Sequence, residues 1–255
     1  MTEKLVKICG IRRPQDATAA INSGADILGV IMVPNRQRTI AHEDALEISK
    51  AVHAARDEKH RKFKNAKELN SHIASQSFAS HEEYLLSYHD LILQNGPFLT
   101  GVFRNQDPKT VFELAEQLNL DIIQLHGSED PAEFMALNTD NKFCIVKRFV
   151  LPEQTEYMTN FLKTLHTTDN KGFALPLLDS ELGGEGKTID LSLINDLQGS
   201  FILAGGLTPD NLKNTKDFIN NVVGFDVSGG VEDDSGFKDH NKISQFVAEG
   251  KKLSI

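Results

Sequence analysis

Leu5-Val6-Lys7-Ile8-Cys9-Gly10 is the first of a series of short apolar runs that each end at a loop and lead into a helical pattern. The alternation predicts a strand that ends at Gly10, and a helix follows at residues 14–23 with proline in its first turn. Because side chains alternate between the two faces of a strand, Lys7 and Cys9 point to the same side. A thiol at a strand end, with a cation on its face, is either an inert core residue or a reactive one. This stretch alone leaves both open.

The composition limits the classes of protein to which the chain can belong. Its 255 residues, 40% apolar and 25% charged, fit one large domain or two small ones with a sizeable core. The net charge of −9 argues against general nucleic-acid binding, which requires a basic surface. An anionic ligand would therefore need cations or backbone N–H groups placed locally.

The cysteines and the apolar runs indicate an intracellular setting. Cys9 and Cys144 are far apart and give neither a disulfide framework nor metal-ligand spacing. The N-terminus lacks the apolar region of a secretory signal, and the longest apolar run, residues 27–33, is too short to cross a bilayer. We expect a soluble cytoplasmic protein with no membrane partner. Cys144 lies inside a predicted strand, and we interpret it as a small buried apolar residue.

Repetition of the opening pattern predicts the fold. The predicted strands lie at residues 5–9, 27–33, 98–103, 121–125, 143–149, 173–178, 201–204 and 222–227. The predicted helices follow them at residues 14–23, 42–55, 108–118, 131–137, 153–165, 191–197, 209–218 and 238–251. Strands buried on both faces and separated by helices form a parallel sheet. Eight such units predict an α/β fold, a single (β/α)8 TIM barrel spanning residues 1–255. The main rival is a doubly wound open sheet, and its nucleotide-binding version is weakened because no G-x-G-x-x-G follows the first strand.

Residues 56–97 interrupt this regularity between the second helix and the third strand. They are polar and rich in Lys, Ser and His, although apolar residues recur at helical spacing and predict a helix at residues 81–94. The polarity predicts an insertion on the barrel surface, outside the core. Six of the nine histidines lie between His42 and His89, and their spacing matches no metal-ligand pattern, so we interpret them as solvated.

Reactive residue types are concentrated at the predicted strand ends, where barrel enzymes place their active sites. They are Cys9, the loop Arg36-Gln37-Arg38, Arg104, His126, Arg148, Asp179 and Asp226. Asp179 ends an apolar run, and a carboxyl in a partly apolar environment can serve as a general acid, although a helix or loop cap is an equal alternative. His126 is ambiguous between a structural hydrogen bond and a ligand contact.

Two glycine pairs indicate phosphate binding. Gly205-Gly206 and Gly229-Gly230 follow strands seven and eight, where barrels often bind phosphate through backbone N–H groups. Two ordinary tight turns are the alternative, but the presence of both pairs at this position favours phosphate. Residues 183–188 resemble a Walker A loop, yet Glu181 stands where that motif needs glycine, and a flexible lid fits their glycine content better.

Five motifs in one order resemble the phosphoribosylanthranilate isomerase family of tryptophan biosynthesis, over nearly the whole chain except residues 56–97. The motifs are Lys7-Ile8-Cys9-Gly10, Gln124-Leu125-His126-Gly127, Leu177-Leu178-Asp179-Ser180 with residues 183–188, Ala204-Gly205-Gly206-Leu207, and Asp226-Val227-Ser228-Gly229-Gly230-Val231-Glu232. The resemblance implies a (β/α)8 barrel that uses neither metal nor cofactor. It implies an Amadori rearrangement of N-(5-phosphoribosyl)anthranilate to 1-(2-carboxyphenylamino)-1-deoxyribulose 5-phosphate.

The resemblance also implies a role for each matching residue. Cys9 resembles the general base, Asp179 the general acid, and Arg38 the arginine that meets the anthranilate carboxylate. The implied phosphate contacts are Gly205, Gly206, Ser228 and Gly229, and His126 and Asp226 match further substrate-binding positions. Many relatives have Ser-Ser-Gly in place of Ser228-Gly229-Gly230, so one phosphate contact would be backbone only. A small phosphorylated substrate, no nucleic acid and a monomeric state are expected.

Three points stay open in the sequence. Lys7 could favour the thiolate of Cys9, and a buried structural ion pair is equally compatible with its position. Other phosphosugar barrels are the enzymatic alternatives. The histidine-pathway isomerase uses two aspartates, and indole-glycerol-phosphate synthase uses lysine and glutamate. A catalytically silent barrel that binds a phosphorylated metabolite is the non-enzymatic alternative, against which Cys9 and Asp179 argue.

Overall fold

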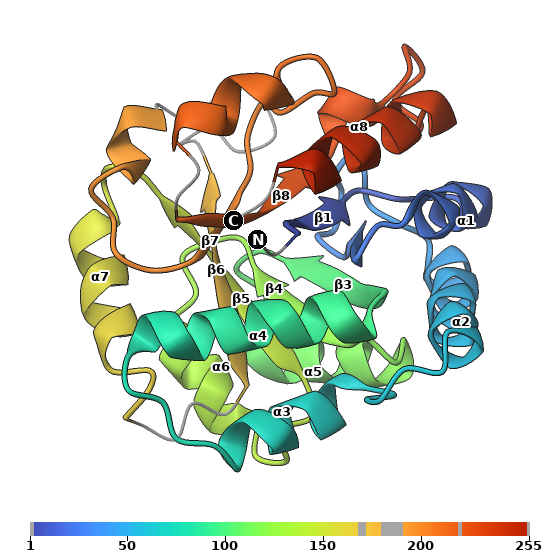
Figure 1. Cartoon of the computed structure of the whole chain (residues 1–255). Coiled ribbons are helices and arrows are strands. Elements are labelled where there is room, and N and C mark those ends of the chain that lie inside the picture. The colour runs from blue at the N-terminus through green and yellow to red at the C-terminus, as the bar shows by residue number, and fades with distance from the viewer. Residues whose placement is uncertain (1–2, 168–171, 180–190, 219–220, 254–255) are drawn as a thin grey trace.

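The computed structural model in Figure 1 describes residues 3–167, 172–179, 191–218 and 221–253. Eight parallel strands close into a barrel in which each strand pairs with its neighbours in chain order, so the predicted (β/α)8 barrel is confirmed. The strands are β1 (Leu5–Ile8), β2 (Ile27–Ile31), β3 (Phe98–Phe103), β4 (Ile122–Leu125), β5 (Cys144–Val150), β6 (Phe173–Asp179), β7 (Phe201–Leu203) and β8 (Val222–Val227).

Helices surround the barrel and connect successive strands. The α-helices are α1 (Pro14–Ser23), α2 (His42–Glu58), α3 (Ala66–Ala74), α4 (His81–Asn95), α5 (Pro108–Gln117), α6 (Pro131–Leu137), α7 (Thr155–Lys163) and α8 (His240–Lys252). Three short 3-10 helices are η1 (Leu191–Ile194), η2 (Leu212–Phe218) and η3 (Gly229–Val231). Proline occupies the first turn of α1, α5 and α6, where its fixed φ suits a helix start and its missing N–H costs nothing. Among the described residues, no helix combines the length and apolar character that crossing a membrane requires.

Residues 191–194 and 212–218 form 3-10 helices, whereas α-helices were predicted at residues 191–197 and 209–218. Polar side chains in and near the second of these segments bond the local backbone. Asn211 Nδ2 donates to Gly206 O at 2.8 Å, and Thr215 Oγ1 donates to Leu212 O at 2.7 Å. Such side chains compete with the α-helical hydrogen-bond pattern, and short 3-10 turns result.

The expectation that residues 56–97 lie outside the core is wrong. They form α3 and α4, and Tyr84, Leu85 and Tyr88 are fully buried in the main hydrophobic core. In Figure 1, α4 lies across the barrel close to both chain ends. The Tyr84 hydroxyl donates to Phe173 O at the start of β6, and His89 Nε2 bonds Glu3 O just before β1, at 3.0 Å. The segment therefore covers the N-terminal end of the barrel, opposite the strand ends that carry the reactive side chains.

The histidine interpretation is wrong at two positions for the same reason. His81 and His89 are buried, because both lie on the face of α4 that packs against the barrel. The predicted helix at residues 81–94 is present as α4, whereas α3 was not predicted. The average polarity of the segment concealed an apolar stripe that one helix face is enough to bury.

Candidate active site

A cavity of about 880 Å³ opens at the C-terminal ends of the strands. The structure brings all the site residues predicted from the sequence into its lining: Cys9, Arg38, His126, Asp179, Gly205, Gly206, Asp226, Ser228 and Gly229. They come from strands or loops far apart in the chain. This cavity is therefore the candidate active site.

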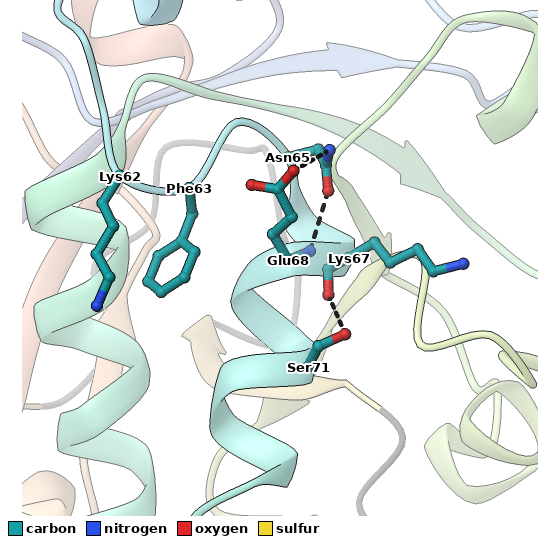
Figure 2. Close-up of a pocket in the computed structure, with 6 residues that line it drawn as sticks. All are labelled: Lys62, Phe63, Asn65, Lys67, Glu68 and Ser71. Carbon is teal, nitrogen blue, oxygen red and sulfur yellow. Dashed lines mark hydrogen bonds between the residues drawn. The ribbon is translucent and has the colours of Figure 1, made fainter.

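A second hollow, of about 530 Å³, lies at the start of α3 and is shown in Figure 2. Several of its polar groups are engaged in hydrogen bonds of the helix start itself. Asn65 Oδ1 accepts from Glu68 N at 3.0 Å, and Ser71 Oγ donates to Lys67 O at 2.8 Å. No strand end contributes to its lining. We interpret it as a surface depression beside a helix cap.

Cys9 is both buried and at the cavity. It directly follows β1, only 6% of the residue is exposed, and its backbone N–H donates to Val227 O at 2.8 Å. The thiol sits against Gly29 of β2, where an added Cβ would lie 2.8 Å from Cys9 Sγ. Glycine at this position leaves the space that the thiol occupies.

The surroundings of Cys9 favour the thiol. Burial raises the pKa of Cys9 above its usual value of 9.0, and the nearby Lys7 ammonium opposes that rise without cancelling it. The charge of Asp226 raises the pKa further, whereas Lys238 lowers it. A thiolate at this position therefore depends on its neighbouring cations.

Lys7 forms a buried ion pair below the cavity. Its Nζ lies 3.0 Å from Asp226 Oδ2 and donates to Gln124 Oε1 at 2.8 Å. Lys7 and Asp226 are register partners on β1 and β8, which explains why they meet. Burial lowers the pKa of Lys7, but the charges of Asp226 and Cys9 outweigh burial, and the pKa is raised. The other oxygen of Asp226, Oδ1, has no hydrogen-bond partner among the described residues and lies in a residue that lines the cavity.

Asp179 ends β6 and is 3% exposed. Arg148 Nε donates to Asp179 Oδ2 at 3.2 Å, and His126 Nε2 lies 3.8 Å from the same oxygen. The sequence predicted an apolar environment for this carboxyl, and the apolar run of β6 does precede it. The guanidinium of Arg148 is an additional partner, and it stabilises a carboxylate at this position.

His126 follows β4 and remains neutral. Burial lowers the pKa of His126 from 6.5 to about 3, and the positive charges of Arg148, Lys7, Arg104 and Lys147 act in the same direction. Its contact with Asp179 is therefore not an ion pair near neutral pH. A neutral imidazole can donate one hydrogen bond and accept another without competing for the proton of an acid.

Arg38 is held by a residue to which the sequence analysis gave no role. Its Nε and Nη2 donate to the two carboxylate oxygens of Glu232 at 2.7 and 2.8 Å. Lys238 Nζ lies 2.9 Å from Glu232 Oε1 and donates to Ser228 O at 2.9 Å. The only sequence signal for Glu232 was its place at the end of the last motif, and Lys238 had none.

The two glycine loops lie against each other. Gly205 and Gly206 have φ values of 88° and 63°, which other residues rarely adopt. A Cβ on Gly230 would collide with Leu207 O, so the loop after β8 approaches the loop after β7 too closely for a side chain. Lys238 Nζ donates to Ser228 O, and a Cβ on Gly229 would lie 3.2 Å from Arg38 Nη2, so both cations lie beside the loop after β8. The acidic chain thus has the local cations and backbone N–H groups that an anion needs.

Metal ligands and the lid predicted from the sequence are two further features of the site. Among the described residues, no group of three or more His, Cys, Asp or Glu side chains could hold a metal ion. The lid predicted at residues 183–188 lies outside the described part of the chain.

Known proteins resemble the chain over almost its full length. The family model described as N-(5'phosphoribosyl)anthranilate (PRA) isomerase matches residues 53–249. The N-(5'-phosphoribosyl)anthranilate isomerase of Candida albicans is 42% identical over 251 residues, 98% of this chain and 99% of that protein. The crystal structure of phosphoribosyl anthranilate isomerase from Thermotoga maritima has a TM-score of 0.69 at 28% identity and covers 99% of this chain and 100% of its own. A phosphoribosyl anthranilate isomerase in complex with reduced 1-(o-carboxyphenylamino)-1-deoxyribulose 5-phosphate has a TM-score of 0.66 at 26% identity, with 99% of this chain and 100% of that chain covered.

Proposed function

Because the chain belongs to the N-(5'-phosphoribosyl)anthranilate isomerase family of tryptophan biosynthesis, we propose that it performs the Amadori rearrangement with Asp179 as general acid and Cys9 as general base. The substrate is N-(5-phosphoribosyl)anthranilate and the product is 1-(2-carboxyphenylamino)-1-deoxyribulose 5-phosphate. The observation that carries the proposal is that a carboxyl and a thiol, from β6 and the end of β1, line one cavity.

The first step needs an acid. Asp179 donates its proton to the furanose ring oxygen, the bond between that oxygen and C1′ breaks, and the anilino nitrogen supplies the electron pair that forms the iminium. Asp179 is left as a carboxylate. Arg148, at 3.2 Å, stabilises this charge as it develops, which assists the transfer.

The second step needs a base. The Cys9 thiolate removes the proton from C2′, and the electrons of that C–H bond neutralise the iminium to give an enolamine, which tautomerises to the ketone. No bond forms between sulfur and carbon. The reactive form of the enzyme therefore has a protonated Asp179 and a deprotonated Cys9, although burial favours the protonated thiol. Lys7 and Lys238 stabilise the thiolate that this form requires.

The remaining groups hold the substrate. Glu232 occupies Nε and Nη2 of Arg38, which leaves Nη1 to meet the anthranilate carboxylate. Asp226 Oδ1 is an acceptor for a substrate hydroxyl or N–H, because no described group satisfies it. Neutral His126 hydrogen-bonds the reacting sugar beside Asp179.

The phosphate of the substrate binds the two glycine loops. Backbone N–H groups of Gly205, Gly206 and Gly229 and the hydroxyl of Ser228 provide the donors, and Arg38 and Lys238 provide positive charge nearby. The ligand of the related solved structure, a reduced carboxyphenylamino-deoxyribulose phosphate, carries a carboxylate at one end and a phosphate at the other. A cavity with cations and glycine loops suits a ligand of that kind.

The proposal is tested by the fluorescence of the anthranilate moiety during turnover. Purified protein mixed with freshly made N-(5-phosphoribosyl)anthranilate should change that fluorescence in proportion to enzyme concentration, and the rearranged ketose phosphate should accumulate. If the substrate only hydrolyses at its uncatalysed rate, or is bound without conversion, the proposed activity is wrong and a binding protein remains.

A further inference from the structure

We propose that Glu232 is a positioning residue for Arg38, and that Lys238 ties this pair to the phosphate loop, so that one ionic unit presents both ends of the substrate site. The proposal rests on the proposed function. Glu232 and Lys238 hold Arg38 and Ser228 in place and act on the substrate through them.

The Arg38–Glu232 contact has the geometry of a preorganised pair. Both distances, 2.7 and 2.8 Å, are short, and they join two parallel donors to the two oxygens of one carboxylate. Such a fork fixes the plane of the guanidinium as well as its position. The Arg38 side chain remains 25% exposed in the cavity, while that of Glu232 is 10% exposed.

Lys238 continues the unit into the loop after β8. Its side chain is 1% exposed, and its Nζ reaches Glu232 Oε1 and Ser228 O, both at 2.9 Å. Burial alone would raise the pKa of Glu232 above 4.5, but Arg38 and Lys238 outweigh burial and hold the pKa lower. Glu232 therefore stays ionised, and its two cations stay fixed around it.

Glycine provides the space for this unit on two sides. A Cβ on Gly10 would lie 2.7 Å from Ser228 Oγ and 3.1 Å from Arg38 Cδ. A Cβ on Gly229 would lie 3.2 Å from Arg38 Nη2. The loops after β1, β2 and β8 therefore converge on one ion cluster, and glycine at position 229 gives the guanidinium room.

The consequence concerns binding more than chemistry. A free arginine on a surface loop samples many rotamers, and ordering it on binding costs affinity. Glu232 orders Arg38 before the substrate arrives. Loss of Glu232 should therefore raise KM, whereas kcat should fall much less, because Glu232 takes part in neither of the two proposed proton transfers.

The test is a double-mutant cycle of Glu232→Gln and Arg38→Lys. In the wild-type background, Glu232→Gln should raise KM by about tenfold or more and lower kcat less than about threefold. In the Arg38→Lys background the same substitution should have little further effect, because lysine cannot form the fork. Glu249→Gln, which removes an exposed carboxylate of α8 paired with Lys252, is the matched control and should change neither constant.

Lys238 gives a second route if Glu232→Gln folds poorly. Lys238→Arg keeps the charge and should retain near-wild-type KM. Lys238→Met should raise KM as Glu232→Gln does, and it should also lower kcat, because Cys9 loses a cation that stabilises its thiolate. Equal effects of Glu232→Gln with and without Arg38, or a fall in kcat with KM unchanged, would overturn the proposal. Calorimetry with reduced 1-(o-carboxyphenylamino)-1-deoxyribulose 5-phosphate measures the same cycle without turnover. A wild-type protein that binds this ligand but does not convert the substrate would contradict the proposed function alone.

Discussion

Lys7 Nζ lies 3.0 Å from Asp226 Oδ2 across the β1–β8 pair, and Lys7 precedes by two residues Cys9, which directly follows β1. Lys7 is therefore one half of a buried ion pair, and it is also the cation that opposes the rise in the pKa of Cys9 caused by burial. The two roles of Lys7 that the sequence left open are compatible, and they make separable predictions.

Replacing Lys7 with methionine should shift the pH dependence of the reaction. The pKa of Cys9 is already raised by burial, and Lys7 lowers it, so its loss raises the pKa further. A base acts when deprotonated, so the limb on which kcat/KM rises with pH should move to higher pH. The pH at which the thiolate absorbance of Cys9 appears, measured as the difference between the enzyme and Cys9→Ser, should also be higher when Lys7 is replaced.

Lys147→Met is the matched control for that experiment. Lys147 is also buried on a barrel strand, with its Nζ 3.6 Å from Glu129 Oε2, and it is not among the charges that act most strongly on the pKa of Cys9. Both variants should lose stability, on the order of 3 kcal/mol, because each leaves a buried carboxylate without its cation. A Lys7→Met enzyme with an unshifted limb would limit Lys7 to its structural role.

The low pKa of His126 should make the folded protein less stable in mild acid. Its pKa is about 3 in the folded protein and near 6.5 when exposed, so the unfolded chain binds an extra proton as the pH falls from 6.5 towards 3. That proton destabilises the fold across this window, and above it the full stability is present. His126→Gln should therefore lose less stability than wild type between about pH 7 and about pH 5.

Denaturant unfolding at the two pH values measures this difference. The effect is moderated because 23% of the His126 side chain is exposed. The same substitution at His42, which is exposed on α2, is the control. Parallel losses in wild type and His126→Gln would show that the histidine is protonated in the folded protein.

Gly29→Ala should damage catalysis by crowding the thiol. The new Cβ would lie 2.8 Å from Cys9 Sγ and 3.2 Å from Cys9 Cα, so the strand end must shift. Overpacking of this kind costs about 1–3 kcal/mol, and a displaced base should lower kcat by about tenfold or more. Gly250→Ala, which would crowd Val6 Cγ2 at the same 2.8 Å, should lose comparable stability and keep its kcat. Equal kcat losses in both variants would point to general destabilisation.

Helix α4, which covers the N-terminal end of the barrel, should contribute to stability and not to turnover. Tyr84→Phe removes the hydroxyl that bonds Phe173 O and should cost about 1 kcal/mol, while Tyr88→Ala empties a fully buried site and should cost about 3–5 kcal/mol. Because α4 lies at the N-terminal end of the barrel, kcat of the folded fraction should not change. A selective loss of kcat without loss of stability would contradict this assignment.

The sequence predicted the barrel because its signal is repeated and local. Each strand is an apolar run of the length that two buried faces require, and eight of them in series allow few folds. The prediction for residues 56–97 was wrong because their average polarity concealed a single buried apolar stripe through Tyr84 and Tyr88. The spacing Asn65-x-x-Glu68 is a helix-start signal that would have revealed α3, since Glu68 N donates to Asn65 Oδ1.

The site was predictable as a set of residues and not as a set of contacts. Strand-end position brought Cys9 and Asp179 into one prediction, and the structure puts both at one cavity. The partners of these groups depend on barrel register and loop packing. Arg38 and Glu232 are 194 residues apart, and no local pattern encodes their fork.

The most direct test of the acid–base assignment is the turnover number of Cys9→Ser and Asp179→Asn, with Cys144→Ser as the matched control at a buried thiol of β5. Each active-site variant should remain folded and lose kcat by on the order of 10²–10⁴-fold, while Cys144→Ser keeps its kcat. A folded Cys9→Ser or Asp179→Asn enzyme with near-wild-type kcat would contradict the role given to that residue.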